Sequence, residues 1–416
     1  MWGRPGVAVA LVLAMVGASC SAGEGKTKTT SSEGGTIEDP AASGVVISPG
    51  AASVPVEGSI SASDLSDIEP GDSQGGPHTD QLGVWAETQE PEATTTTAPS
   101  TTTESRDPLA APVLAAPERG RIVIHGTGDV SLDDRQLGGA MGRYGHGWAW
   151  SGLGGLFERD DLTVINLECI PSTLGAPRDK KFTFRCDLDG LSLMAASGVD
   201  VANMANNHAG DFGSRALLDG RANLIRSGVR PVGAGRDLAQ AIQPAYVEVG
   251  GWTIATFGFS LVTGGDGWFA GATQPGVAWA DQATMVAAIT AADAVADLIV
   301  VSIHWGEGGD RTPRAINRRL AQAMIEVGVD IIFGHHSHRR NPMEILNGKP
   351  VFWGLGNFVW PDLDIDSSRG AVGEVVVEPD GSITGRLLPS LVESDGHPVL
   401  LTQPDWTLRV GPNRLG

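Results

Sequence analysis

Basic residues are scarce in this chain of 416 residues, which has 29 Lys plus Arg, 49 Asp plus Glu and a formal net charge of −20. A chain this acidic is a poor candidate for binding DNA or RNA by neutralising phosphates, so we exclude nucleic-acid binding. Aromatic residues are almost absent from residues 21–118, where Trp85 stands alone among 16 acids and 3 bases. That segment cannot build a hydrophobic core, whereas residues 119–416, with nearly all the Trp and Phe, can.

The N-terminal apolar run is short. It covers residues 7–16, and about ten residues are too few to span a bilayer as a permanent helix. Arg4 before the run and small residues after it are typical of an export signal, which we assign to residues 1–20. The small residues lead into Cys20, which predicts a lipidated cysteine anchoring the chain to the extracellular face of the cell membrane. Ordinary cleavage followed by free secretion is the alternative.

Residues 21–118 are rich in Ser, Thr, Ala, Gly and Pro, and we expect them to form a disordered acidic linker. A flexible chain of this length spans roughly 50–60 Å, which would hold a folded domain away from a membrane. A low-complexity spacer with no further task is the alternative. We place the folded domain at residues 119–395 and a C-terminal extension at residues 396–416.

Helical patterns alternate with apolar strands in the folded part, at residues 191–197, 214–227, 281–294 and 313–327. This alternation indicates an α/β domain whose sheet strands are buried on both faces. In the last pattern, Thr312 and Pro313 are typical of an N-cap and a first helical residue.

Five apolar stretches predict the strands, and each runs into polar side chains at its carboxyl end, where ligands gather in such sheets. A single Asp or His there is commonly a turn residue, but five successive cases indicate a shared site. Carboxylates, amides and imidazoles together suit Mn, Zn or Fe, and such mixtures are typical of two-metal hydrolytic sites. The polar side chains are Asp129, Asn166 and Glu168, Asn206 to His208, His304, and the histidines 335, 336 and 338.

Taken in order, these blocks resemble the CapA family, which is associated with bacterial poly-γ-glutamate capsule synthesis and lies within the calcineurin-like metallophosphatase superfamily. The resemblance implies a four-layer sandwich of two β-sheets flanked by helices, with a metal site at one edge. It is carried by Gly128-Asp129, Asn166-Leu167-Glu168, Asn206-Asn207-His208 with Asp211 and Gly213, His304-Trp305-Gly306, Gly334 to His338, and Gly356-Asn357-Phe358.

The resemblance also implies which residues would act. His208 matches the histidine that contacts substrate, and Asp211 would orient its other nitrogen, with a turn-forming role as the alternative for Asp211. His336 and His338 are two apart on what we expect to be an extended segment, so both can face the site, while His335 would point away and pack or bond to the backbone. Two divalent ions (Mn, Zn or Fe) would be held by Asp129, Glu168, Asn207, His304, His336 and His338.

One departure from the superfamily pattern bears on activity. Ser131 stands where the opening motif carries a histidine, so one ion would be held weakly or through water.

Cys169 and Cys186 form an even pair in an oxidising compartment once Cys20 is assigned to lipid. They bracket the loop 170–185, and a disulfide there would contribute about 3 kcal/mol and fix the neighbouring Glu168. Two free thiols, or metal ligation by Cys169, are the alternatives.

Three functions stay open at this point. The favoured hypothesis is a surface-anchored, CapA-like protein that takes part in making, exporting or attaching poly-γ-glutamate or another anionic polymer. Its partners would be capsule-synthesis membrane proteins, and its metal centre would act on a phosphoester or an amide link. The alternatives are a metal-dependent phosphoesterase of the envelope unconnected with capsules, and a non-catalytic scaffold with a vestigial site.

Overall fold

The computed structural model describes residues 118–262, 264, 268–361 and 364–401. The predicted export signal, the predicted linker except residue 118, and residues 402–416 of the predicted C-terminal extension lie outside the described residues. Among the described residues, no helix combines the length and the apolar character that crossing a membrane requires.

The first β-sheet has eight strands and contains β1, the strand that ends at Asp129 and Val130. Strands β1 to β4 are parallel, and β14 to β16 extend the sheet with antiparallel pairs. The order is β16 (Pro398–Leu400), β15 (Ile383–Val392), β14 (Arg369–Val377), β1 (Ile122–Val130), β2 (Leu162–Leu167), β3 (Val201–Asn203) and β4 (Arg230–Val232), with β13 (Asn357–Val359) also paired to β1.

The second sheet has six strands, of which the inner four are parallel. A separate pair joins β5 (Ala234–Gly235) to β8 (Gly276–Val277). The order of the six is β11 (Met343–Leu346), β12 (Lys349–Phe352), β10 (Ile331–His335), β9 (Leu298–His304), β7 (Trp252–Ser260) and β6 (Ala245–Val249).

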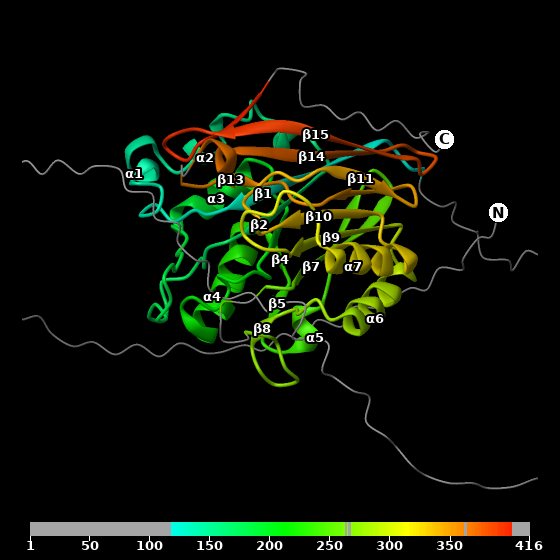
Figure 1. Ribbon diagram of the computed structural model, residues 1–416, viewed down its shortest axis with the longest axis horizontal. Coiled ribbons are helices and arrows are strands. Elements are labelled where there is room, and N and C mark those ends of the chain that lie inside the picture. Colours follow the sequence, from blue (N-terminus) through cyan, green and yellow to red (C-terminus); the bar gives the residue numbers. More distant parts are fainter. Residues whose placement is uncertain (1–117, 263, 265–267, 362–363, 402–416) are drawn as a thin grey trace, which may run out of the picture. The chain divides into compact units, whose positions relative to one another are not determined.

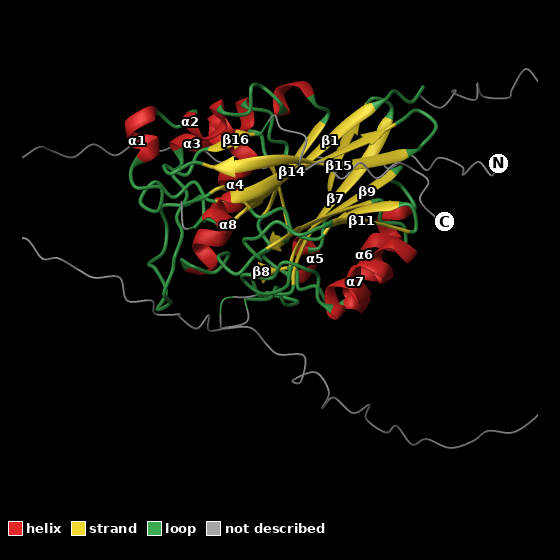
Figure 2. Ribbon diagram, turned by 45° about the horizontal axis from the view of Figure 1, so that its top comes forward, coloured by secondary structure: helices red, strands yellow, loops and turns green. Residues whose placement is uncertain are grey.

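The two sheets pack face to face, with helices on their outer faces (Figures 1 and 2). Ile124 of the first sheet and Phe333 of the second belong to one apolar layer between them. The helices are α1 (Ala140–Tyr144), α2 (Trp148–Ser151), α3 (Asp189–Ala196) and α4 (Gly213–Ser227) in the first half, with a 3₁₀ turn at Phe157–Arg159, and α5 (Leu238–Ala241), α6 (Gln282–Asp293), α7 (Ala315–Glu326) and α8 (Ile365–Ser368) in the second.

Two further apolar layers lie outside the sheets. Leu217 of α4 belongs to the layer on the first sheet, and Ile289 of α6 and Leu320 of α7 belong to the layer on the second. The four-layer sandwich of two β-sheets flanked by helices is therefore confirmed. It explains why the predicted strands are apolar throughout, since each inner strand is covered on both faces.

The predicted start of α7 is wrong. The helix begins at Ala315 with Arg314 as its N-cap, so Thr312 and Pro313 precede it. Arg314 is bound through its guanidinium to Asp310 and Glu307, and its backbone is extended (φ −74°, ψ 162°), which delays the first helical residue.

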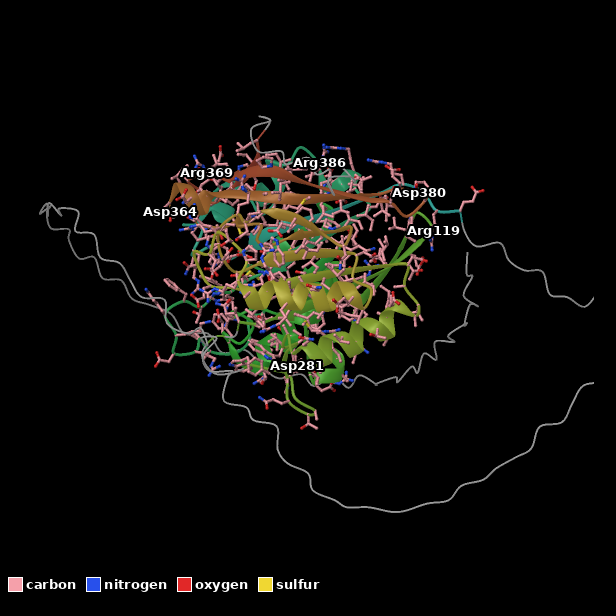
Figure 3. All side chains as sticks on the ribbon, turned by 45° about the vertical axis from the view of Figure 1, so that its right-hand side comes forward. Arg119, Asp281, Asp364, Arg369, Asp380 and Arg386 are labelled. Atoms are coloured by element: carbon pink, nitrogen blue, oxygen red, sulfur yellow. A yellow bond between two sulfur atoms is a disulfide. The ribbon has the colours of Figure 1, made fainter. Side chains whose placement is uncertain are left out.

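A buried ion-pair network joins the first sheet at the end of β1 opposite to Asp129. His125 is 2% exposed, and its Nδ1 lies 2.6 Å from Oδ2 of Asp160 while its Nε2 lies 3.4 Å from Oε2 of Glu374. Arg386, labelled in Figure 3, bonds Glu374 from β15. Burial opposes charge on His125, but the two carboxylates outweigh it and raise its pKa above 6.5. The pKa of Glu374 falls from 4.5 to about 2, because the bonds from His125 and Arg386 outweigh its burial.

These shifts predict a pH window for the network. The contribution of His125 is complete below pH 6.5 and is lost as the pH rises through its higher folded pKa; that of Glu374 is complete above pH 4.5 and is lost toward about pH 2. We expect His125→Gln to lower the free energy of unfolding more at about pH 5.5 than at about pH 9, as measured by urea denaturation. An equal cost at both pH values would contradict the charged network.

Candidate metal centre

Two carboxylates and one imidazole from both sheets meet at a buried point. Asp129 lies at the end of β1, Glu168 follows β2, and His304 ends β9. One ligand atom from each lies within 4.8 Å of the others, and all three side chains are 0% exposed. Parallel pairing places these strand ends at one edge, since Asp129 is level with Asn166 and His304 is level with His335.

A single amide bridges the two carboxylates. Nδ2 of Asn166 donates to Oδ1 of Asp129 and to Oε1 of Glu168, each at 2.8 Å, and lies 3.2 Å from Nδ1 of His304. Nδ2 of Asn206 in turn donates to Oδ1 of Asn166 at 3.3 Å, which fixes the orientation of the bridging amide. Asn166 thus holds the group together without adding charge.

A close approach of two backbones completes the Asp129 side of the site. A Cβ atom on Gly128 would lie 2.2 Å from the carbonyl oxygen of Gly356, so only glycine fits there. The same approach brings Asn357 level with Asp129 in the pairing of β1 with β13. Oδ1 of Asn357 bonds Nδ1 of His338 at 2.8 Å, a contact that sequence reasoning missed although the Gly356-Asn357 motif signals it.

His336 and His338 reach the site by a turn that follows β10. Strand β10 ends at His335, and His336 (φ 86°) and His338 (φ 50°) have left-handed backbones, so the predicted extended segment is wrong. Nδ1 of His338 nevertheless lies 3.2 Å from Oδ2 of Asp129, and the ring centre of His336 lies 4.5 Å from that of His304.

His335 does not point away from the site as expected. Its Nε2 lies 2.9 Å from Oγ of Ser302, and its Nδ1 lies 3.6 Å from Oδ1 of Asp129. The strand continues through His335 and turns only afterwards, which is why alternation assigned its face wrongly.

Asn207 and His208 flank the group on the loop after β3. Oδ1 of Asn207 lies 2.9 Å from Nε2 of His304, and Nδ1 of His208 lies 2.8 Å from Oδ2 of Asp211. The predicted contact between Asp211 and His208 is therefore confirmed. Asp211 also accepts from Nζ of Lys180 at 2.6 Å and from the backbone N–H of Phe184 at 2.7 Å, so it does more than form a turn.

Lys180 is a further site residue that sequence reasoning missed. It lies on the loop between Cys169 and Cys186, which form a disulfide with a Cα–Cα distance of 5.0 Å. The disulfide hypothesis is confirmed, and the alternatives of free thiols and metal ligation by Cys169 are excluded. Nothing in the local sequence indicates that Lys180 reaches Asp211, because the contact depends on how this closed loop folds back.

The two carboxylates differ in how their charge is supported. Burial opposes ionisation of Asp129, but the hydrogen bond and charge of His338 and the charge of His335 outweigh it and lower its pKa. Burial raises the pKa of Glu168 well above its ordinary value, and the neighbouring charge of Asp129 raises it further. An ionised Glu168 therefore requires an added positive charge close by.

His304, His335 and His336 are held neutral. Burial lowers the pKa of His335 to about 4 and that of His336 to about 3, in the second case with help from the charge of His338. Burial and the charges of His336, His335 and His338 lower the pKa of His304 well below its ordinary value. Neutral imidazoles have the lone pair that a metal ion needs.

These residues fit divalent metal ions. Oε2 of Glu168 and Nδ1 of His336 are buried with no hydrogen-bond partner among the described residues, which is costly unless a ligand satisfies them. Two other groups of possible ligands in the described part of the chain, His146 with Asp187 and Asp189, and Glu393 with Asp395 and His397, are exposed or half-buried. The six predicted ligands all belong to the one connected site, and their role as ligands stays a prediction.

The comparison with protein families matches residues 123–362 to the family described as Bacterial capsule synthesis protein PGA_cap. The chain belongs to this family. Two relatives, from Bacillus subtilis and Mycobacterium tuberculosis, show how far the similarity extends.

The chain is 38% identical to "PGA biosynthesis protein CapA" of Bacillus subtilis over 183 residues, which cover 44% of this chain and 48% of the relative. It is 33% identical over 255 residues to the "Probable polyglutamine synthesis accessory protein" of Mycobacterium tuberculosis, covering 58% of this chain and 67% of the relative. The chain thus spans about half of the first relative and two thirds of the second. Among solved structures, the NAD nucleotidase of Haemophilus influenzae aligns with a TM-score of 0.40 and 15% identity, covering 68% of this chain and 60% of that one.

We expect Glu168→Gln to stabilise the metal-free protein and to abolish stabilisation by metal. The pKa of Glu168 is raised, so above pH 4.5 its ionised form destabilises the fold until a cation binds, and a neutral amide removes that penalty. At neutral pH the melting temperature without metal should rise by about 2 °C or more. The increase that Mn²⁺ gives the unsubstituted protein should disappear.

The matched control for this substitution is Glu158→Gln, which alters an exposed carboxylate. A Glu168→Gln protein that melts lower without metal and still responds fully to Mn²⁺ would contradict the assignment.

Proposed function

We propose that this chain is an exported, surface-anchored accessory protein of polyglutamate-type capsule synthesis, and that its metal centre hydrolyses a link in the anionic polymer. Membership of the capsule synthesis family supports the polymer. One observation carries the hydrolytic part: Asp129, Glu168 and His304 lie together without solvent, and Oε2 of Glu168 has no partner among the described residues.

The residues of the site divide into those that hold metal and those that move a proton. Asp129, Glu168, Asn207, His304, His336 and His338 would hold two divalent ions. Bound divalent ions of this kind activate water at neutral pH and stabilise negative charge at the reacting carbonyl or phosphoryl group.

His208 would donate the proton to the leaving atom. Its Nδ1 is fixed by Asp211, and its Nε2 has no partner among the described residues and is available for the transfer. Nζ of Lys180 lies 2.6 Å from Oδ1 of Asp211, the oxygen that does not contact His208, and holds that carboxylate in place. An orienting carboxylate of this kind fixes the tautomer and direction of a catalytic imidazole.

Aromatic rings restrict solvent around the proton donor. The ring centre of Phe184 lies 4.2 Å from that of His208, and Trp360 lies 5.5 Å from Phe184 and 4.7 Å from His338. A site with fewer waters strengthens the electrostatic interactions inside it.

Anchoring belongs to the same proposal. Lipid on Cys20 would fix the chain to the membrane, and the linker of residues 21–118 would place the catalytic domain at a distance from it, where a growing extracellular polymer would pass. Membrane proteins of capsule synthesis would be its partners there.

We expect the purified full chain to bind about two divalent transition-metal ions, as measured by elemental analysis after incubation with Mn²⁺ and Zn²⁺. Asp129→Ala should lower the content to fewer than about one ion, because that carboxylate contacts the ligands on both sides of the site. Asp189→Ala, which alters a more exposed candidate group, is the control and should bind as the unsubstituted chain does. Absence of bound metal from the unsubstituted chain would favour the scaffold alternative.

We expect His208→Gln to lower kcat by roughly 10²–10⁴-fold with little change in KM, since it removes the proton donor and spares the metal ligands. The assay follows new amine ends released from a γ-linked glutamate oligomer, in parallel with an aryl phosphodiester. Cleavage of the phosphodiester alone would favour an envelope phosphoesterase instead. Loss of bound metal in the His208→Gln protein would show that His208 is a ligand and contradict its role as proton donor.

A further inference from the structure

A concave surface lies away from the metal centre, at the amino end of β4 in the first sheet. It is formed by the second half of α4, the start of β4 and the start of β6, and we call it the α4–β6 groove. Its volume is about 430 Å³, within the range of small-ligand sites. Strand β4 runs parallel to β1 and contributes its amino end, whereas the metal centre lies at the carboxyl ends. The groove is lined by Arg221, Ile225, Arg230, Pro231, Pro244 and Tyr246.

Arg221 is a half-buried cation without a partner. Its guanidinium makes no hydrogen bond and no ion pair with any described residue, and its Nε is fully buried. Burial lowers the pKa of Arg221, and the nearby charge of Arg236 lowers it further. A desolvated cation without a counter-charge costs free energy, which an anionic ligand would recover.

The other groove residues define the ligand. Arg230 adds a second, exposed cation on β4. Tyr246 is 44% exposed, and burial of the rest raises the pKa of its hydroxyl, which therefore stays protonated and able to donate. Ile225 is 53% exposed beside Pro244 and offers an apolar surface. Cations, a hydroxyl donor and an apolar wall together suit a carboxylate carried on methylene groups.

We propose that the α4–β6 groove binds a stretch of polycarboxylate chain, with one carboxylate on Arg221 and its methylenes against Ile225 and Pro244. The proposal rests on the proposed function for the choice of polymer. A γ-linked glutamate residue fits this chemistry, since each unit carries one free carboxylate and two methylenes. The groove would hold the polymer away from the metal centre while another stretch reaches the catalytic residues.

The test measures binding of a fluorescein-labelled, γ-linked glutamate decamer to the full chain by fluorescence anisotropy at low salt. Arg221→Met should weaken binding about tenfold, because it removes a charge-assisted hydrogen bond and keeps the aliphatic stem. Arg221→Lys should recover part of the loss. Arg226→Met is the matched control: it removes the same charge from α4 but at an exposed position paired with Asp219, and binding should change less than about twofold.

Two further probes fix the ligand class. The corresponding decamer of γ-linked isoglutamine, in which each α-carboxylate is an amide, lacks the carboxylates and should bind more than about tenfold more weakly. Tighter binding of a polyphosphate that also depends on Arg221 would assign the groove to phosphate and overturn the proposal. Equal losses for Arg221→Met and Arg226→Met would overturn it as well, since long-range charge alone would then explain binding.

The same variants separate this proposal from the proposed function. Arg221→Met should keep the metal content of the unsubstituted chain and its cleavage of an aryl phosphodiester, and its melting temperature should not fall, since the substitution removes a desolvated cation. If the proposed metal centre is wrong, the unsubstituted chain will bind no metal and cleave no phosphodiester, and these two results do not depend on the groove. If the Arg221→Met protein keeps its metal content and binds the decamer as tightly as the unsubstituted chain, the groove proposal is wrong and the proposed function is unaffected.

Discussion

The rest of the site depends on the burial of two neighbouring carboxylates. Asp129 and Glu168 are both 0% exposed and share one amide donor, Asn166, which cannot neutralise them. Burial raises the pKa of Glu168 well above its ordinary value, and the nearby charge of Asp129 raises it further, unless a cation enters. His304 and His336, whose pKa values are lowered by burial, supply lone pairs without charge, and a divalent metal ion would relieve the repulsion between the carboxylates.

The fold supplies that constraint by bringing two parallel sets of strands to a common edge. Asp129 and Glu168 come from the first sheet and His304 from the second, so the site exists only when the sheets are packed together. The disulfide fixes a second part of the site. Cys169 follows Glu168 directly, and its bond to Cys186 closes the loop that brings Lys180 to Asp211. Closure of the disulfide and assembly of this part of the site are thereby linked.

How much the sequence reveals depends on how local each contact is. Apolar strands ending in polar residues predicted the α/β class and the convergence of Asp129, Glu168 and His304, because parallel strands share a carboxyl edge. The arrangement of His336 and His338 could not be predicted from alternation, since both have left-handed backbones after the strand has ended. Contacts made by a loop folding back over many residues, such as that of Lys180 with Asp211, have no local pattern.

The most direct test of the central claim is anomalous X-ray diffraction from crystals of the full chain grown with Mn²⁺. We predict anomalous peaks in the space between Asp129, Glu168 and His304 and beside His336 and His338. Peaks found only at His146 with Asp187 and Asp189, or only at Glu393 with Asp395 and His397, would contradict the claim, as would a crystal without any peak.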